Sequence, residues 1–121
     1  MRVAVMQPYF FPYVGYFQLM HAVDCFVFYD DAQYMKGGWV NRNRILHAGA
    51  PRWWTYPVAR EDYRLPISVR RYDRTPANDR SLLDKLDTAY RRAPRHGAVR
   101  AVVEHALEGE EARVSALNEQ L

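Results

Sequence analysis

The sequence contains a single cysteine, Cys25, among its 121 residues. One thiol can neither close a disulfide within the chain nor build a zinc site from cysteines. The four histidines stand at positions 21, 47, 96 and 105, without the spacing of a His-Glu-x-x-His metal motif. We therefore expect no resident metal.

Long apolar runs are also missing. No segment approaches the roughly 18 uncharged apolar residues that a membrane-spanning helix needs. The opening "MRVAVMQP" holds one arginine and a few apolar residues, which is too short for a secretory signal. From these absences we expect no membrane span and a cytoplasmic location.

Lysine is scarce: of the 17 lysine and arginine residues, only Lys36 and Lys85 are lysines. The formal net charge is +3 and the pI is about 9.2. Arginine favours planar, bidentate contacts to carboxylate or phosphate, although a general use of arginine on the surface explains the count equally well. The basic residues are scattered and match no RNA-binding signature, so nucleic-acid binding has little support.

The pattern of the first 34 residues predicts a strand, a helix and a second strand. Residues 2–7 read as a strand ending at Pro8, and residues 14–23 read as a short helix. The run from Cys25 to Tyr29 is apolar without alternation, which is typical of a strand buried on both faces. Such burial would make the Cys25 thiol inert. This order is that of a βαβ unit with parallel strands.

The rest of the chain predicts a hairpin followed by helices. Two strands flank residues 47–51, and of Trp53 and Trp54 at least one should be core because neighbours in a strand face opposite ways. Helices are expected after Ser81, over residues 98–109 and from residue 110 to the end, with the charged segment 60–80 as a loop holding a short strand at 67–69. We expect one α/β domain over 1–121, with a small, mainly parallel sheet opened by the βαβ unit, a hairpin insertion and a helical carboxyl-terminal half.

The loop after the first strand, "QPYFFPYVGY", is the first candidate site. Ligands of open α/β sheets bind beyond the carboxyl ends of the strands, and prolines stiffen this loop before a ligand arrives. The alternative is that its rings merely cap one end of the sheet. Its candidate residues, which offer hydrogen-bonding groups or close approach, are Gln7, Pro8, Tyr9, Tyr13, Gly15 and Tyr16.

The second strand ends in Asp30 and Asp31, followed by Gln33 and Tyr34. If the first two strands are parallel neighbours, these residues lie beside the first loop. A carboxylate there could bind an amine, hold Mg²⁺ or act as a base. The alternative is that the two aspartates only turn a loop.

The segment "KGGWVNRNR" follows directly and supplies the basic candidates. In an extended chain Asn41 and Asn43 lie on one face, and Arg42 and Arg44 on the other. An arginine pair beside asparagines suits a phosphate or carboxylate, although a solvated edge strand shows the same pattern. The candidates for substrate binding are Lys36, Trp39, Asn41, Arg42 and Arg44.

The stretch from Val3 to Leu46, "VAVMQPYFFPYVGYFQLMHAVDCFVFYDDAQYMKGGWVNRNRIL", resembles the amino-terminal signature of the WbqC-like protein family. The later segments "LLDKLDTAYRRAPR" and "VSALNEQL" are similar to weaker motifs of that family. The resemblance implies a bacterial protein of O-antigen or secondary-metabolite biosynthesis and a glycine-type or aminoacyl transferase role. Members are usually about twice this length, so the chain is either a short form or lacks a carboxyl-terminal portion.

A resemblance at the level of the fold links the opening βαβ unit to HUP-type nucleotidyltransferases. "YVGY" stands where those enzymes carry a His-x-Gly-His-like motif, with tyrosines in place of the histidines that face an ATP phosphate. This alternative function would place Mg²⁺ on the aspartates and triphosphate on the arginines. It rests on analogy.

Aminoacyl transfer is the leading hypothesis. Asp30 or Asp31 would deprotonate an acceptor amine on a sugar or metabolite, while Gln7 with Tyr9 or Tyr16 would donate to the developing oxyanion. Asn41, Arg42 and Arg44 would hold the phosphate of a carrier arm, of a tRNA end or of a nucleotide-sugar. The acyl donor would be an aminoacyl thioester on a carrier protein or an aminoacyl-tRNA. A third hypothesis is a non-catalytic binding module, favoured by an apolar stripe at the carboxyl end that would invite a partner helix or self-association.

Overall fold

The computed structural model describes residues 1–121 and confirms the α/β class, with a parallel strand pair, an antiparallel hairpin and helices in the carboxyl-terminal half. Strand β1 (Val3–Met6) is followed by helix α1 (Val14–Ala22) and strand β2 (Cys25–Phe28). The two strands pair in parallel, with Val3 opposite Cys25 and Met6 opposite Phe28. The predicted βαβ unit is therefore confirmed.

The expectation that β2 is buried on both faces was wrong. Only one face of the β1–β2 pair is covered by α1, where the rings of Tyr16 and Phe26 meet at 5.3 Å. On the other face Val3, Val5 and Val27 are 50%, 56% and 42% exposed, and Cys25 is exposed as well. The apolar run from Cys25 to Tyr29 therefore has one face that packs its rings against α1 and another apolar face that is open.

The hairpin is formed by β3 (Arg42–His47) and β4 (Ala50–Thr55), which pair antiparallel in a sheet of their own. Its two turn residues, Ala48 and Gly49, have φ values of 50° and 76°. Positive φ at both central positions gives the turn whose twist matches that of the strands, and glycine accepts it without strain. As expected, one of the paired tryptophans is core: Trp54 is 3% exposed and Trp53 is 42% exposed.

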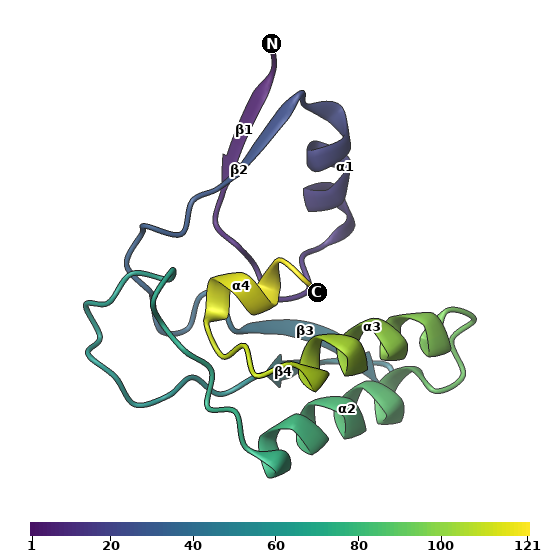
Figure 1. The fold of residues 1–121 in the computed structure, drawn as a ribbon. Coiled ribbons are helices and arrows are strands. Elements are labelled where there is room, and N and C mark those ends of the chain that lie inside the picture. The colour runs from purple at the N-terminus through teal and green to yellow at the C-terminus, as the bar shows by residue number, and fades with distance from the viewer.

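Helices α2 (Pro76–Tyr90) and α3 (His96–Glu108) pack on each other, and α2 lies against the hairpin (Figure 1). The start expected at Ser81 was too late. Thr75 caps α2 by accepting a hydrogen bond from the Asn78 amide at 3.1 Å, and Pro76 occupies the first turn. The Thr-Pro pair is a known helix-start signal that the apolar stripe alone does not reveal.

No strand forms at residues 67–69, which corrects a third expectation. The segment 57–75 crosses the molecule as a loop held by isolated bridges, namely Gln33 with Pro66, Val58 with Tyr72 and Arg71 with Arg113. Ile67 is fully buried within this loop. Its apolar side chains thus serve the core without forming a strand.

The last helix, α4 (Val114–Asn118), is shorter than the expected third helix and lies between the βαβ unit and the hairpin (Figure 1). Val114 and Leu117 are fully buried in the core, and Leu121 packs against that core. The expected exposed apolar stripe at the carboxyl end was therefore wrong, and the argument for a binding module that rested on it falls. The core joins the loop after β1 and the segment between β2 and β3 to β4, to the loop 57–75 and to the three later helices. Its members are Phe10, Tyr34, Val40, Trp54, Tyr56, Ile67, Tyr72, Leu82, Leu86, Val103, Ala106, Val114 and Leu117.

Candidate functional site

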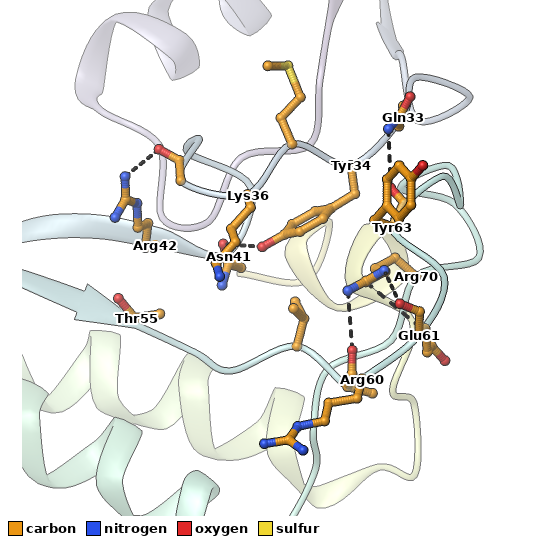
Figure 2. A pocket seen from close by; sticks show the side chains of 14 residues that line it. Gln33, Tyr34, Lys36, Asn41, Arg42, Thr55, Arg60, Glu61, Tyr63 and Arg70 are labelled. Atoms are coloured by element: carbon orange, nitrogen blue, oxygen red, sulfur yellow. Dashed lines mark hydrogen bonds and ion pairs between the residues drawn. The ribbon is translucent and has the colours of Figure 1, made fainter.

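A cleft of about 740 Å³ opens between the turn before β3, the end of β4 and the loop 58–63 (Figure 2). Its size lies within the usual range for small-molecule sites. Five of the predicted site residues line it together: Gln33, Tyr34, Lys36, Asn41 and Arg42. The remaining lining residues are Met35, Gly37, Thr55, Val58, Ala59, Arg60, Glu61, Tyr63 and Arg70. We call this hollow the cationic cleft, because its lining contains four basic side chains and one carboxylate.

The floor of the cationic cleft is a buried hydrogen-bond chain. The Tyr34 hydroxyl donates to Asn41 Oδ1 at 2.9 Å (Figure 2). Asn41 Nδ2 in turn donates to the Tyr56 carbonyl at 3.0 Å. Burial raises the pKa of Tyr34, while the positive charges of Arg70 and Arg42 oppose that shift. Tyr34 therefore stays a neutral donor at physiological pH. Asn41 has both its amide groups engaged, so it shapes the cleft and fixes the start of β3.

Arg70 forms one wall, with a side chain only 8% exposed. Its guanidinium donates to the carbonyls of Asp62 at 2.8 Å and Ala59 at 3.3 Å, and it lies 4.9 Å from the centre of the Tyr34 ring. Its Nε has no hydrogen-bond partner. That nitrogen lies 4.0 Å from Glu61 Oε2, so Arg70 and Arg71 share one carboxylate, and the positive charge of Arg70 is only partly compensated.

Glu61 is the one carboxylate among the lining residues. It accepts hydrogen bonds from Arg71, through Nε at 2.6 Å and through the backbone amide at 3.1 Å. Burial raises the pKa of this carboxyl, but the Arg71 hydrogen bonds and the charges of Arg71 and Arg70 outweigh it, so that the net pKa is lowered. The negative charge is thus already paired, and Lys36, Arg42 and Arg60 leave the cleft cationic.

Arg42 stands at the opposite end of the cationic cleft from Arg70 (Figure 2). Its Nε donates to the Gly38 carbonyl at 3.1 Å and its Nη2 donates to the Gly37 carbonyl, which leaves Nη1 for a ligand. Its guanidinium carbon also lies 3.9 Å from the ring centre of Trp53. The turn can present both carbonyls because Gly37 has a φ of +85°, a conformation that disfavours other residues. Arg42 is therefore ordered before any ligand binds.

A second cavity of about 520 Å³ lies beside the first loop, and we call it the aromatic pocket. It contains three more predicted residues, Tyr9, Tyr13 and Trp39, and is completed by Met6, Pro12 and Asn43. The structure therefore divides the predicted binding residues between two cavities. Arg44 lines neither of them. It contacts a smaller hollow of about 270 Å³ and lies 4.8 Å from the Trp53 ring centre.

The remaining residues of the first loop face inward or sideways. The Tyr16 hydroxyl donates to the Gln7 carbonyl at 2.7 Å, and burial, with the nearby Tyr9, raises the pKa of Tyr16 to about 12. Pro8 is buried, and a Cβ on Gly15 would collide with the Tyr13 ring. None of these four residues (Gln7, Pro8, Gly15 and Tyr16) lines the cationic cleft or the aromatic pocket.

The two aspartates after β2 also lie outside both cavities. Asp30 accepts a hydrogen bond from the Ser115 hydroxyl at 2.6 Å, which ties the end of β2 to α4. Asp31 is exposed. Gln33, two residues further on, donates to the Tyr63 carbonyl at 3.2 Å and so fastens the wall of the cleft (Figure 2).

Sequence reasoning missed the contribution of the loop 58–70, which supplies Arg60, Glu61, Tyr63 and Arg70 to the cationic cleft. The available signal was the density of arginine in "REDYRLPISVRR". We interpreted that segment as a charged loop with a short strand at 67–69 and assigned it no site residue. No three His, Cys, Asp or Glu side chains gather anywhere as a metal site. Each helix is too short or too polar to cross a membrane.

Comparison with known proteins supplies the family. Residues 7–121 match the WbqC-like protein family, so the chain belongs to that family. A curated relative, the uncharacterized protein Rv1507c of Mycobacterium tuberculosis (strain ATCC 25618 / H37Rv), is 47% identical over 57 residues. Those residues are 47% of this chain and 25% of the relative, so the match spans about a quarter of that protein's length. No solved structure matches the chain.

Proposed function

We propose that the cationic cleft binds the anionic part of a small-molecule substrate, a phosphate or a carboxylate, for a group-transfer reaction. The observation that carries this proposal is the charge of the lining. Four basic side chains, Lys36, Arg42, Arg60 and Arg70, face one carboxylate, Glu61, which is already bonded to Arg71. A concave site with fixed cations and few free anions concentrates negatively charged ligands.

The chemistry that we propose for this site is aminoacyl transfer, as the family resemblance implies. The acceptor amine would attack the acyl carbon of the donor, the new C–N bond would form, and the bond from that carbon to the carrier oxygen or sulfur would break. The amine proton needs a base. Both aspartates lie outside the two cavities, so the acceptor amine would have to extend beyond the cationic cleft to meet this base. Asp31 suits the role better than Asp30, because Asp31 is exposed whereas Asp30 is held by Ser115.

The oxyanion of this reaction needs a hydrogen-bond donor. Of the two tyrosines expected to supply it, Tyr16 already donates to the Gln7 carbonyl, and it would have to break that bond. Tyr9 lines the aromatic pocket and is the better candidate. The donor's phosphate would lie against Lys36 and Arg42, which with Arg60 are the cations of the cleft that are not buried.

The binding step is tested by calorimetric titration of the chain with pyrophosphate and with ribose 5-phosphate. We expect binding that weakens as salt is raised, and a loss of about tenfold in affinity for Lys36→Ala, the effect of one lost charge contact. Lys85→Ala, which removes an exposed lysine on α2 outside the cleft, is the matched control. Equal losses in both variants, or no binding at all, would refute the anion site.

The transfer step is tested separately by mass spectrometry. The chain is incubated with glycyl-pantetheine thioester and an amino sugar, and the amide product is measured. We expect product from the parent protein and at least a hundredfold less from Asp31→Asn, since loss of a general base costs about two orders of magnitude or more. Full activity of a folded Asp31→Asn variant would remove Asp31 from the mechanism.

A further inference from the structure

The aromatic pocket presents ring faces and few free polar groups. Asn43, its amide member, is fully occupied: Nδ2 donates to the carbonyls of Phe10 at 3.2 Å and Phe11 at 2.6 Å, and Oδ1 accepts from the Arg44 amide at 2.7 Å. The rest of the lining is Met6, Tyr9, Pro12, Tyr13 and Trp39. A ligand that fits this lining is flat and needs few hydrogen bonds.

The backbone that carries the rings of the pocket is held in place by hydrogen bonds. The Phe10 amide donates to the Trp39 carbonyl at 3.0 Å, and the Asn118 amide donates to the Pro8 carbonyl at 2.9 Å. Together with the Asn43 hydrogen bonds, they tie the first loop to β3, to the turn before β3 and to α4. Even so, Tyr13 and Trp39 remain 66% and 45% exposed. Exposed rings on a backbone that is already ordered lower the cost of stacking a ligand.

The aromatic pocket and the cationic cleft have no lining residue in common, but the segment from Gly37 to Asn43 contributes to both. Gly37 lines the cleft and Trp39, two residues later, lines the pocket. Trp39 packs on Trp53 with ring centres 5.6 Å apart, and Arg42 of the cleft covers Trp53 at 3.9 Å. Trp53, which lines neither cavity, therefore links the arginine of the cleft to the tryptophan of the pocket, with the two indole rings tilted by 44°. A stacking surface beside fixed cations is the arrangement that binds a base and its phosphate.

From this adjacency we infer that the ligand is a nucleotide. Its base stacks in the aromatic pocket on Trp39 and Tyr13, and its phosphate lies in the cationic cleft. The phosphate half of this inference rests on the proposed function, whereas the base half stands on the pocket. A sugar ring is disfavoured because its hydroxyls need several polar partners, and the pocket offers little beyond the Tyr9 and Tyr13 hydroxyls and the Trp39 ring N–H.

The test compares four probes by calorimetry on the full chain: AMP, adenosine, ribose 5-phosphate and methyl glucoside. We expect AMP to bind more tightly than adenosine or ribose 5-phosphate, and methyl glucoside not to bind. Trp39→Ala should weaken AMP binding by about tenfold, the scale of one lost base-stacking contact, and leave ribose 5-phosphate unchanged. Lys36→Ala should weaken ribose 5-phosphate and leave adenosine unchanged.

Two further variants separate stacking from loss of structure. Tyr29→Ala removes a ring that is 51% exposed after β2 and lies in neither cavity, so AMP affinity should not change. Gly15→Ala adds a Cβ that displaces the Tyr13 ring without removing any aromatic group, so AMP affinity should fall. Thermal melts of all variants confirm folding.

The outcomes distinguish the two proposals. If ribose 5-phosphate binds and AMP binds no better, the nucleotide inference is overturned while the anion site stands. If adenosine binds, but Lys36→Ala weakens the affinity for neither AMP nor ribose 5-phosphate, the anion site is refuted. The nucleotide assignment is then refuted with it. Binding of methyl glucoside as tightly as AMP would overturn the base assignment in favour of a sugar.

Discussion

The side-chain amide of Asn118 donates to the Pro8 carbonyl at 2.9 Å, which joins the last helix to the loop after the first strand. The same Nδ2 donates to the Val40 carbonyl at 2.7 Å, and Oδ1 accepts from the Tyr72 hydroxyl at 2.6 Å. Asn118 is 6% exposed. One buried amide thus connects four segments of the chain, including both segments that carry the aromatic pocket.

Replacing Asn118 with alanine should cost about 3 kcal/mol of unfolding free energy. The change removes three hydrogen bonds and leaves the Pro8 carbonyl buried without that donor, and each unsatisfied buried group costs about 1–3 kcal/mol. Urea denaturation measures the loss. Gln120→Ala, at an exposed position two residues on, should change stability by less than about 0.5 kcal/mol. Equal stability of the two variants would show that the Asn118 contacts do not form.

The second prediction concerns the cap at the start of α2, and Ser81 in the same helix provides its control. Thr75→Ala should destabilise the protein by about 1 kcal/mol, because the Asn78 amide loses the cap that Thr75 provides. Ser81→Ala lies on an exposed position inside the same helix and should be neutral or slightly stabilising, since alanine is the better helix former. Chemical denaturation of both variants measures the difference. The reverse order would place the helix start at Ser81.

Cys25 supplies a third prediction. Its side chain lies on the open face of the β1–β2 pair, so it should react with a thiol reagent such as dithionitrobenzoate in the folded protein. We expect one equivalent of thiol to react without denaturant, at a rate close to that in denaturant. Protection that disappears only on unfolding would mean that this face is covered in solution. A melt recorded before and after modification serves as the control for folding.

The elements with strong local signals were predictable from the sequence. The βαβ unit, the hairpin turn at Ala48 and Gly49, and α3 follow from periodicity and turn residues. The errors arose where tertiary contacts decide. A stripe containing Val114 and Leu117 reads the same in the sequence whether it is exposed or buried, and its burial depends on core residues far away in the chain, such as Phe10 and Tyr72. Likewise, the valines at positions 3, 5 and 27 do not reveal whether a second layer of the protein covers their face of the β1–β2 pair.

The candidate site was only partly predictable for a similar reason. Lys36, Asn41 and Arg42 form a local cluster, and adjacency in the sequence already indicates a common site. Arg70 reaches the same cleft only because the loop 57–75 folds back beside Gln33, through the bridge to Pro66. No local pattern encodes that return. The choice between the two cavities for Tyr34 and Trp39 likewise depends on the turn at Gly37, whose conformation the sequence suggests but does not place.

The pH dependence of stability should report the state of Glu61. Its folded pKa is lowered below the ordinary value of 4.5, so its stabilising contribution is fully present above pH 4.5 and is lost as the pH falls through the folded value. At pH 7 we expect Glu61→Gln to be less stable than the parent by about 2 kcal/mol, because buried Arg70 and its neighbour Arg71 lose their anion.

Urea denaturation from pH 8 to pH 3 tests this sign. The difference in unfolding free energy between the parent and Glu61→Gln should stay constant from pH 8 to about pH 5 and shrink below it, as the parent's own carboxyl becomes neutral. Glu110→Gln, at an exposed position, controls for the general effect of removing a negative charge from a cationic chain. A difference that instead grows as the pH falls would mean that Glu61 is held protonated. In that case the cationic cleft would lack its internal anion, and its positive charge would be greater than the Glu61–Arg71 pair implies.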